Sequence, residues 1–183
     1  LEIFTNDEIK AIVKKTRDFE YVLKRRELTT NDFITYIQYE INLEKLQRIR
    51  CNNRMQHATK EQKNNYYKLQ ANMIKHICYI YNRAVRRFSY DNQLWIEYID
   101  FLQIMKSYSL LNGVYGQALA LNPKCEALWI SAVVYEINVN NNIHAARILY
   151  QTALRKNTSN EVLWLKYFEF EIWQASRTAR LYI

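Results

Sequence analysis

Glycine and proline are scarce in this chain, whose 183 residues include only 2 Gly and 1 Pro. Average usage would give about 13 and 9. Sheets joined by tight turns need both residues, because glycine supplies positive φ angles and proline a fixed φ angle. The scarcity argues against a sheet-rich domain and predicts an all-α fold.

Cysteines are also few. Cys51, Cys78 and Cys125 are odd in number and widely spaced, which argues against a disulfide framework and favours a reducing compartment. No apolar run approaches the roughly 20 residues needed to cross a bilayer, and no signal peptide is visible. Because the chain begins at Leu1 rather than Met, and its last residues read as part of a helix, we expect a fragment of a longer protein.

Acidic residues are nearly missing from one segment. Residues 45–88 hold 11 Lys/Arg against 1 Asp/Glu, whereas residues 1–44 hold 7 against 9 and residues 89–183 hold 8 against 8. A local basic zone suggests a polyanionic partner, either RNA or an acidic protein tail. The alternative is compositional bias, since the chain also contains 18 asparagines.

Two sets of aromatic residues recur at one period. Within each set the spacing is 34 and then 35 residues, and the sets are Trp95, Trp129 and Trp164, and Tyr81, Tyr115 and Tyr150. A period near 34 is typical of solenoids in which helical hairpins stack on one another. The repeat therefore predicts an array of helix pairs.

The helical pattern predicts a first helix over 5–27, a second that starts near Thr30 and a third that runs through Phe88. It predicts further helices over 91–106, 109–121, 124–138, 142–156 and 160–173. Thr5 and Glu8 form a capping box for the first helix. We expect N-terminal helices with a divergent first repeat over residues 1–47, a basic Asn-rich insert over 48–70 that forms a loop or an extended helix end, and the repeat array over 71–183.

The periodic aromatic and alanine residues are interpreted as packing anchors between helices. A platform that stacks RNA bases also uses aromatic rings, but such rings must be exposed, and a period tied to the fold favours burial. The predicted packing residues are Phe33, Tyr36, Tyr39, Tyr81, Ala84, Trp95, Tyr98, Tyr115, Ala118, Trp129, Tyr150, Ala153, Trp164 and Tyr167.

Candidate catalytic residues are weak. Glu40, Glu136 and Glu171 each follow an anchor ring by seven residues, and we expect them to bond helix ends or arginines of the Arg147 type. The three histidines are scattered and lack metal-ligand spacing. No Gly-rich phosphate loop exists. We therefore expect no enzymatic activity, no metal and no cofactor.

The repeat resembles the half-a-TPR (HAT) family. Its best copies here are Trp164/Tyr167/Phe170/Glu171, followed in the other helix type by Ala146-Arg147, Tyr150 and Ala153-Leu154. A standard TPR would prefer Leu-Gly after the tryptophan. The resemblance implies a right-handed solenoid of HAT/TPR-like repeats in a protein of RNA processing.

The N-terminal segment resembles a more specific family. Ile3-Phe4-Thr5 with Glu8-Ile9, then Phe19-Glu20-Tyr21, then Asp32-Phe33-Ile34 through Leu43, is similar to the start of the U-three small nucleolar RNA-associated protein six family. Residues 51–72 match no pattern of that family. The resemblance implies a nucleolar, non-enzymatic scaffold of the small-subunit processome, with WD-repeat proteins, U-three snoRNA and pre-ribosomal RNA as partners.

Two functions remain open: a protein scaffold, or a direct RNA binder, including one of splicing or 3′-end processing. The second would use basic residues of the middle segment on phosphates. These candidates are Arg48, Arg50, Arg54, Lys60, Lys63, Lys68, Lys75, Arg83, Arg86 and Arg87.

Overall fold

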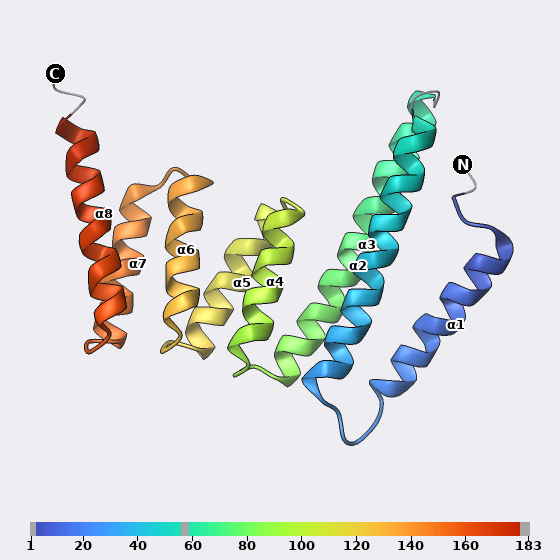
Figure 1. Cartoon of the computed structure of the whole chain (residues 1–183), viewed down its shortest axis with the longest axis horizontal. Helices are drawn as coiled ribbons and strands as arrows, with labels where there is room; N and C mark the ends of the chain where they lie inside the picture. The colour runs from blue at the N-terminus through green and yellow to red at the C-terminus, as the bar shows by residue number, and fades with distance from the viewer. Residues whose placement is uncertain (1–2, 56–58, 180–183) are drawn as a thin grey trace. The chain divides into compact units, whose positions relative to one another are not determined.

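The computed structural model describes residues 3–55 and 59–179; the side chains of residues 54, 55, 178 and 179 fall outside this description. Within these ranges the chain forms eight α-helices and no strand, which confirms the predicted all-α class (Figure 1). The helices are α1 (Asn6–Val22), α2 (Thr30–Met55), α3 (Lys60–Arg87), α4 (Asn92–Ile104), α5 (Tyr108–Leu121), α6 (Glu126–Asn138), α7 (Ile143–Lys156) and α8 (Glu161–Ala179).

The helices form two compact units, residues 1–88 and 89–183. The first holds α1 to α3 and the second α4 to α8. This division follows the short connection after α3 rather than the boundaries expected from composition at residues 47 and 70.

The first helix begins where the capping box predicts. The Thr5 backbone N–H donates to Glu8 Oε2 at 2.9 Å, and the Glu8 N–H donates to Thr5 Oγ1 at 3.3 Å. These bonds satisfy backbone donors that have no partner inside the helix. The helix ends at Val22, so residues 24–26, expected in its last turn, lie in the connection to α2.

The long helices α2 and α3 lie side by side (Figure 1). Residues 48–55 and 60–70, for which the sequence leaves both a loop and an extended helix end open, are helical and extend α2 and α3. Cys51 and Tyr66 of this stretch are buried, so the polar, Asn-rich sequence still supplies an apolar face. Thr59 forms a second capping box with Gln62 and starts α3.

In the second unit, each helix from α4 onward packs against the next, and α6 also contacts α8. The turns after α4 and α6 contain Lys106 and Asn141 in the left-handed region, at φ of 53° and 48°. These residues lie 35 positions apart. The chain therefore makes equivalent left-handed turns without the glycine that usually occupies them.

One hydrogen-bond arrangement repeats across this unit. A backbone carbonyl accepts both the indole N–H of a tryptophan six residues later and the side-chain amide of an asparagine one repeat later. The two copies are Ser89 with Trp95 at 2.8 Å and Asn122 at 2.9 Å, and Pro123 with Trp129 at 3.0 Å and Asn157 at 2.9 Å. We call this acceptor the shared carbonyl, and it joins the segment before each helix pair to the C-terminal end of that pair.

The first unit fills the corresponding sequence positions differently. Phe33 stands where the repeat has tryptophan, and Phe88 stands where it has asparagine. Their ring centroids lie 6.1 Å apart in an edge-on contact. An apolar pair thus replaces the two polar donors. The backbone of Phe88 still ends its helix as the asparagines do, because its N–H donates to the Ala84 carbonyl at 2.9 Å.

Candidate interaction surfaces

Most of the predicted packing residues are buried. Tyr39 and Tyr167 are partly buried, and Trp164 is 51% exposed. The buried members are Phe33, Tyr36, Tyr81, Ala84, Trp95, Tyr98, Tyr115, Ala118, Trp129, Tyr150 and Ala153. These side chains are inaccessible for base stacking, which requires exposed rings.

Trp164 departs from the buried position predicted for it. Its indole keeps the repeat geometry, donating to the Thr158 carbonyl at 2.9 Å. Trp129 is covered by Ala153 and Leu154 of α7 and by Leu163, but no helix of the described residues follows α8 to cover Trp164 in the same way. Trp164 therefore lines an open hollow of 580 Å³.

The exposed face of α8 continues from this hollow. It carries large apolar side chains, which are Val162, Trp164, Leu165, Phe168, Ile172 and Trp173. Contiguous exposed apolar groups of this size mark surfaces that pack against something else.

The repeated glutamates bond neighbouring polar groups, as expected. Glu171 receives two bonds from Arg147, at 2.7 and 2.8 Å, and these bonds lower the pKa of its carboxyl. Glu136 accepts a bond from the Asn140 side chain at 3.0 Å. In this geometry both carboxylates join helices or turns.

Glu40 lies in a polar cluster that joins the three helices of the first unit. It is 5% exposed and accepts a bond from the Thr16 hydroxyl at 3.4 Å, while His76 Nε2 lies 3.9 Å from it. Burial raises the pKa of the Glu40 carboxyl, and the nearby His76 opposes that rise. The Tyr36 hydroxyl lies 3.3 Å from His76, and burial also raises the pKa of Tyr36.

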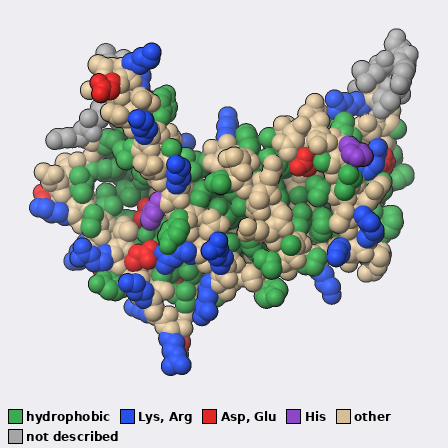
Figure 2. Space-filling model, turned by 180° about the vertical axis from the view of Figure 1, so that it is seen from behind, with side chains coloured by type: hydrophobic (Ala, Val, Ile, Leu, Met, Phe, Trp, Pro, Cys, Tyr) green, Lys and Arg blue, Asp and Glu red, His purple; other side chains and the backbone are tan. Residues whose placement is uncertain are grey.

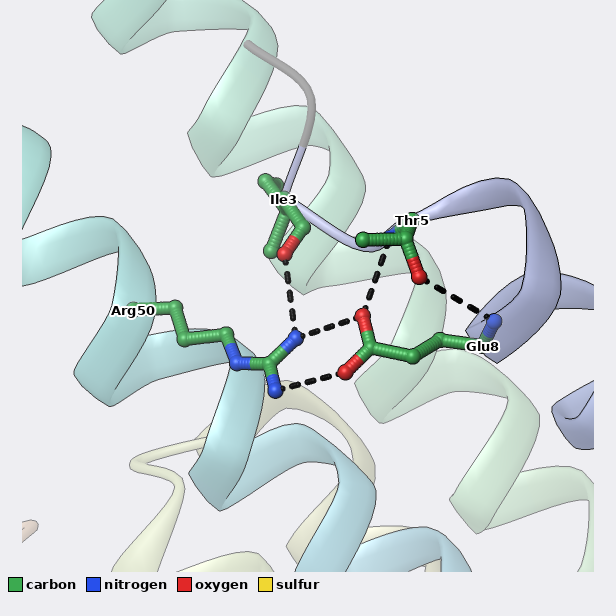
Figure 3. A network of polar contacts seen from close by, with 4 residues as sticks. All are labelled: Ile3, Thr5, Glu8 and Arg50. Carbon is green, nitrogen blue, oxygen red and sulfur yellow. Dashed lines mark hydrogen bonds and ion pairs between the residues drawn. The ribbon is translucent and has the colours of Figure 1, made fainter.

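Arg50, predicted as an RNA contact, is held inside the first unit (Figure 3). Its guanidinium donates to both Glu8 oxygens at 2.9 and 2.8 Å, and to the Ile3 carbonyl at 3.2 Å. The Arg50 bond and the Thr5 N–H bond lower the pKa of Glu8 to about 2. Arg50 therefore joins α2 to the start of α1 and is a poor candidate for phosphate binding.

The other basic candidates do not form one patch. Arg83 donates to Glu20 at 2.7 Å, and the Arg54 side chain lies outside the described residues. Lys60 and Arg87 begin and end α3, so they stand roughly 40 Å apart at 1.5 Å per residue. Figure 2 shows the basic side chains of this unit, at left, dispersed along its length. The exposed candidates are Arg48, Lys60, Lys63, Lys68, Lys75, Arg86 and Arg87.

A separate group of arginines lines a hollow of 480 Å³ at the C-terminal end of α3. Arg83, Arg86 and Arg87 of α3 meet Arg25 of the α1–α2 connection there. Leu23, Leu28 and Phe33 supply the apolar part of the lining. The sequence pattern missed Arg25, because its partners are about 60 residues away along the chain.

The described part of the chain contains no group of three or more His, Cys, Asp or Glu residues that could hold a metal ion. Among its helices, none is long and apolar enough to cross a membrane.

Comparison with known proteins finds similarity to one family. Residues 1–75 match the family model described as U3 small nucleolar RNA-associated protein 6, so the match includes residues 51–72, where the sequence pattern alone showed no resemblance to that family. The chain is 38% identical to U3 small nucleolar RNA-associated protein 6 of Schizosaccharomyces pombe, over 93% of this chain and 34% of that protein.

By sequence, this chain is similar to U3 small nucleolar RNA-associated protein 6. The mouse homolog of that protein is 35% identical over 96% of this chain and 28% of its own length. The Dictyostelium discoideum homolog is 29% identical over 94% of this chain and 27% of its own length. The chain thus spans about a third of the length of the curated relatives it matches.

Proposed function

We propose that this chain is part of a non-enzymatic scaffold subunit of the small-subunit processome in the nucleolus. It organises protein partners, WD-repeat subunits among them, around U3 snoRNA and pre-ribosomal RNA. The observation that carries the proposal is the similarity to U3 small nucleolar RNA-associated protein 6, which extends over 93% to 96% of the chain in three relatives.

The structure supports a scaffold in two ways. Its periodic tryptophans and tyrosines, apart from the exposed Trp164, are buried between helices and are not available as a platform for bases. The exposed apolar face of α8 offers a surface of the kind that packs against protein.

A pull-down of the tagged protein from cell extract tests the proposal, with probes for U3 snoRNA and for WD-repeat proteins. An equally tagged, unrelated helical protein is the control. Recovery of both partners, with the proteins surviving nuclease and high salt, supports the scaffold. Recovery of splicing or 3′-end-processing components instead would refute it.

A second candidate function, direct RNA binding, is favoured by the exposed basic residues near the α2–α3 turn. Arg48, Lys60 and Lys63 are exposed, and no ion pair engages them within the described residues. Replacing all three with glutamine should weaken RNA binding and reduce the log–log salt slope by about 2, at 0.7 per phosphate contact with single strands.

The matched control removes the same charge elsewhere. Lys124, Arg155 and Lys156 of the second unit are also exposed, and their replacement with glutamine should leave RNA affinity within about twofold. Equal losses in both triple variants would mean that RNA responds only to net charge, and an unchanged slope in the first would exclude direct binding there.

A further inference from the structure

The hollow at the C-terminal end of α3 combines positive charge with an apolar lining. Arg25, Arg83, Arg86 and Arg87 surround it, and Leu28 is one of its apolar residues. One of these arginines is already in an ion pair: Arg83 Nη1 lies 2.7 Å from Glu20 Oε1. The charge of Arg25 contributes to lowering the pKa of Asp32, after the bonds from Thr29.

Arg86 and Arg87 are the charges left over. Both are exposed, and within the described residues neither forms an ion pair. Cations at this position stabilise the carbonyl end of a helix, but this stabilisation does not require an apolar hollow beside them. The hollow adds the second element, since Leu23, Leu28 and Phe33 line the same space.

We infer that this hollow binds an acidic segment of a protein partner that presents a bulky apolar side chain between its carboxylates. Arg86 and Arg87 pair with the carboxylates, and the apolar side chain enters the hollow against Leu28. Charge complementarity selects the acid, because two exposed guanidiniums bind carboxylates through paired N–H donors. The inference rests on the proposed function only in taking the partner to be a protein.

The lining favours a peptide over RNA. RNA would bring phosphates to the arginines, but the lining offers its bases no accessible aromatic ring of the kind that single-strand binders use. Phe33, the aromatic residue of the lining, is only 3% exposed and is in edge contact with Phe88. The hollow therefore offers apolar contacts to an aliphatic or aromatic side chain and no accessible aromatic face for a base.

Fluorescence anisotropy with the chain and a labelled decapeptide tests this inference. The probe has four Asp/Glu residues on each side of a central Leu-Phe pair, and a second probe carries Ser-Ser in place of that pair. A ten-residue oligouridylate is the third probe. We expect binding of the Leu-Phe peptide at near-physiological salt, about tenfold weaker binding of the Ser-Ser peptide, and weaker binding still of the oligouridylate.

Variants locate the binding. Replacing Arg86 and Arg87 with glutamine should weaken the Leu-Phe peptide about tenfold or more, and Leu28→Ser should weaken it without changing the Ser-Ser peptide. Replacing Lys60 and Lys63 with glutamine removes the same charge from the other end of α3 and should change affinity less than twofold. Far-UV circular dichroism confirms that each variant folds.

Three results would overturn the inference. One is the absence of peptide binding, and another is an equal loss in the Lys60/Lys63 control. The third is oligouridylate binding that depends on Arg86 and Arg87 while the Leu-Phe pair makes no difference, which would assign the hollow to RNA. Because these measurements use purified chain, their failure leaves the pull-down of U3 snoRNA as a separate test.

Discussion

Truncating the repeated tryptophans should separate a buried anchor from an exposed one. Trp129 is 5% exposed and packs against Ala153, Leu154 and Leu163. Replacing a buried tryptophan with alanine costs about 3–5 kcal/mol, because the cavity adds to the lost transfer free energy. Trp129→Ala should therefore lower the free energy of unfolding by about 4 kcal/mol, a large share of the roughly 5–15 kcal/mol of a small domain.

Trp164→Ala provides the comparison within the same unit. Its ring makes the same indole bond, to the Thr158 carbonyl, but half of its surface is exposed. Since the transfer term scales with the area removed from water, and an open hollow leaves no closed cavity, the cost should be about 1–2 kcal/mol.

Urea unfolding followed by far-UV circular dichroism measures both costs without depending on tryptophan fluorescence. Trp129→Phe is the control for the ring: it loses the indole donor, but the Pro123 carbonyl retains the Asn157 amide at 2.9 Å. The lost indole hydrogen bond should lower the free energy of unfolding by only about 1 kcal/mol, in addition to the cost of the smaller side chain. A loss for Trp164→Ala equal to that for Trp129→Ala would refute the reasoning, because burial would then not set the cost.

Three further substitutions test polar contacts, each by urea unfolding. Asn157→Ala removes the donor to the shared carbonyl of Pro123 and should lower the free energy of unfolding by about 1 kcal/mol. A variant as stable as the unsubstituted chain would refute this prediction. Glu8 has its pKa lowered to about 2, so its contribution is present above pH 4.5 and lost as the pH falls toward 2; Glu8→Gln should remove this acid dependence. Glu40 has the opposite sign: because its pKa is raised, its own contribution to stability is most favourable below about pH 4.5 and declines as the pH rises through the folded-state pKa, and Glu40→Gln should remove that decline.

Local signals in the sequence predicted the helices well. The expected helix over 142–156 is found as Ile143–Lys156, and the capping box placed the start of α1 within one residue. Such features depend on residues three or four positions apart, which a sequence displays directly. Over 48–70 the sequence leaves a loop and an extended helix end open, and the structure shows helix over 48–55 and 60–70. Asparagine disfavours helices only weakly, and burial of Cys51 and Tyr66 between two long helices outweighs that preference.

The candidate basic site could be predicted only as a net charge. Arg50 lies 42 residues from Glu8, and Arg83 lies 63 residues from Glu20, so no local pattern shows that these cations are already paired. The fold also places Lys60 and Arg87 at opposite ends of one helix. A charge count over a segment therefore overstates what a single polyanion can contact, and long-range ion pairs decide which cations stay accessible.

The divergent first repeat shows why residue identity is a poor guide to packing when positions vary together. In the second unit, tryptophan and asparagine meet at one shared carbonyl, so losing either leaves the other donor in place. Phe33 and Phe88 replace both polar partners at once and contact each other instead. A single change from tryptophan to phenylalanine would remove one hydrogen bond. In the first unit one aromatic contact stands in place of two hydrogen bonds, one from the asparagine amide and one from the indole. The contact between Phe33 and Phe88 thus keeps an aromatic anchor at this position, so phenylalanine packs here where tryptophan packs in the second unit.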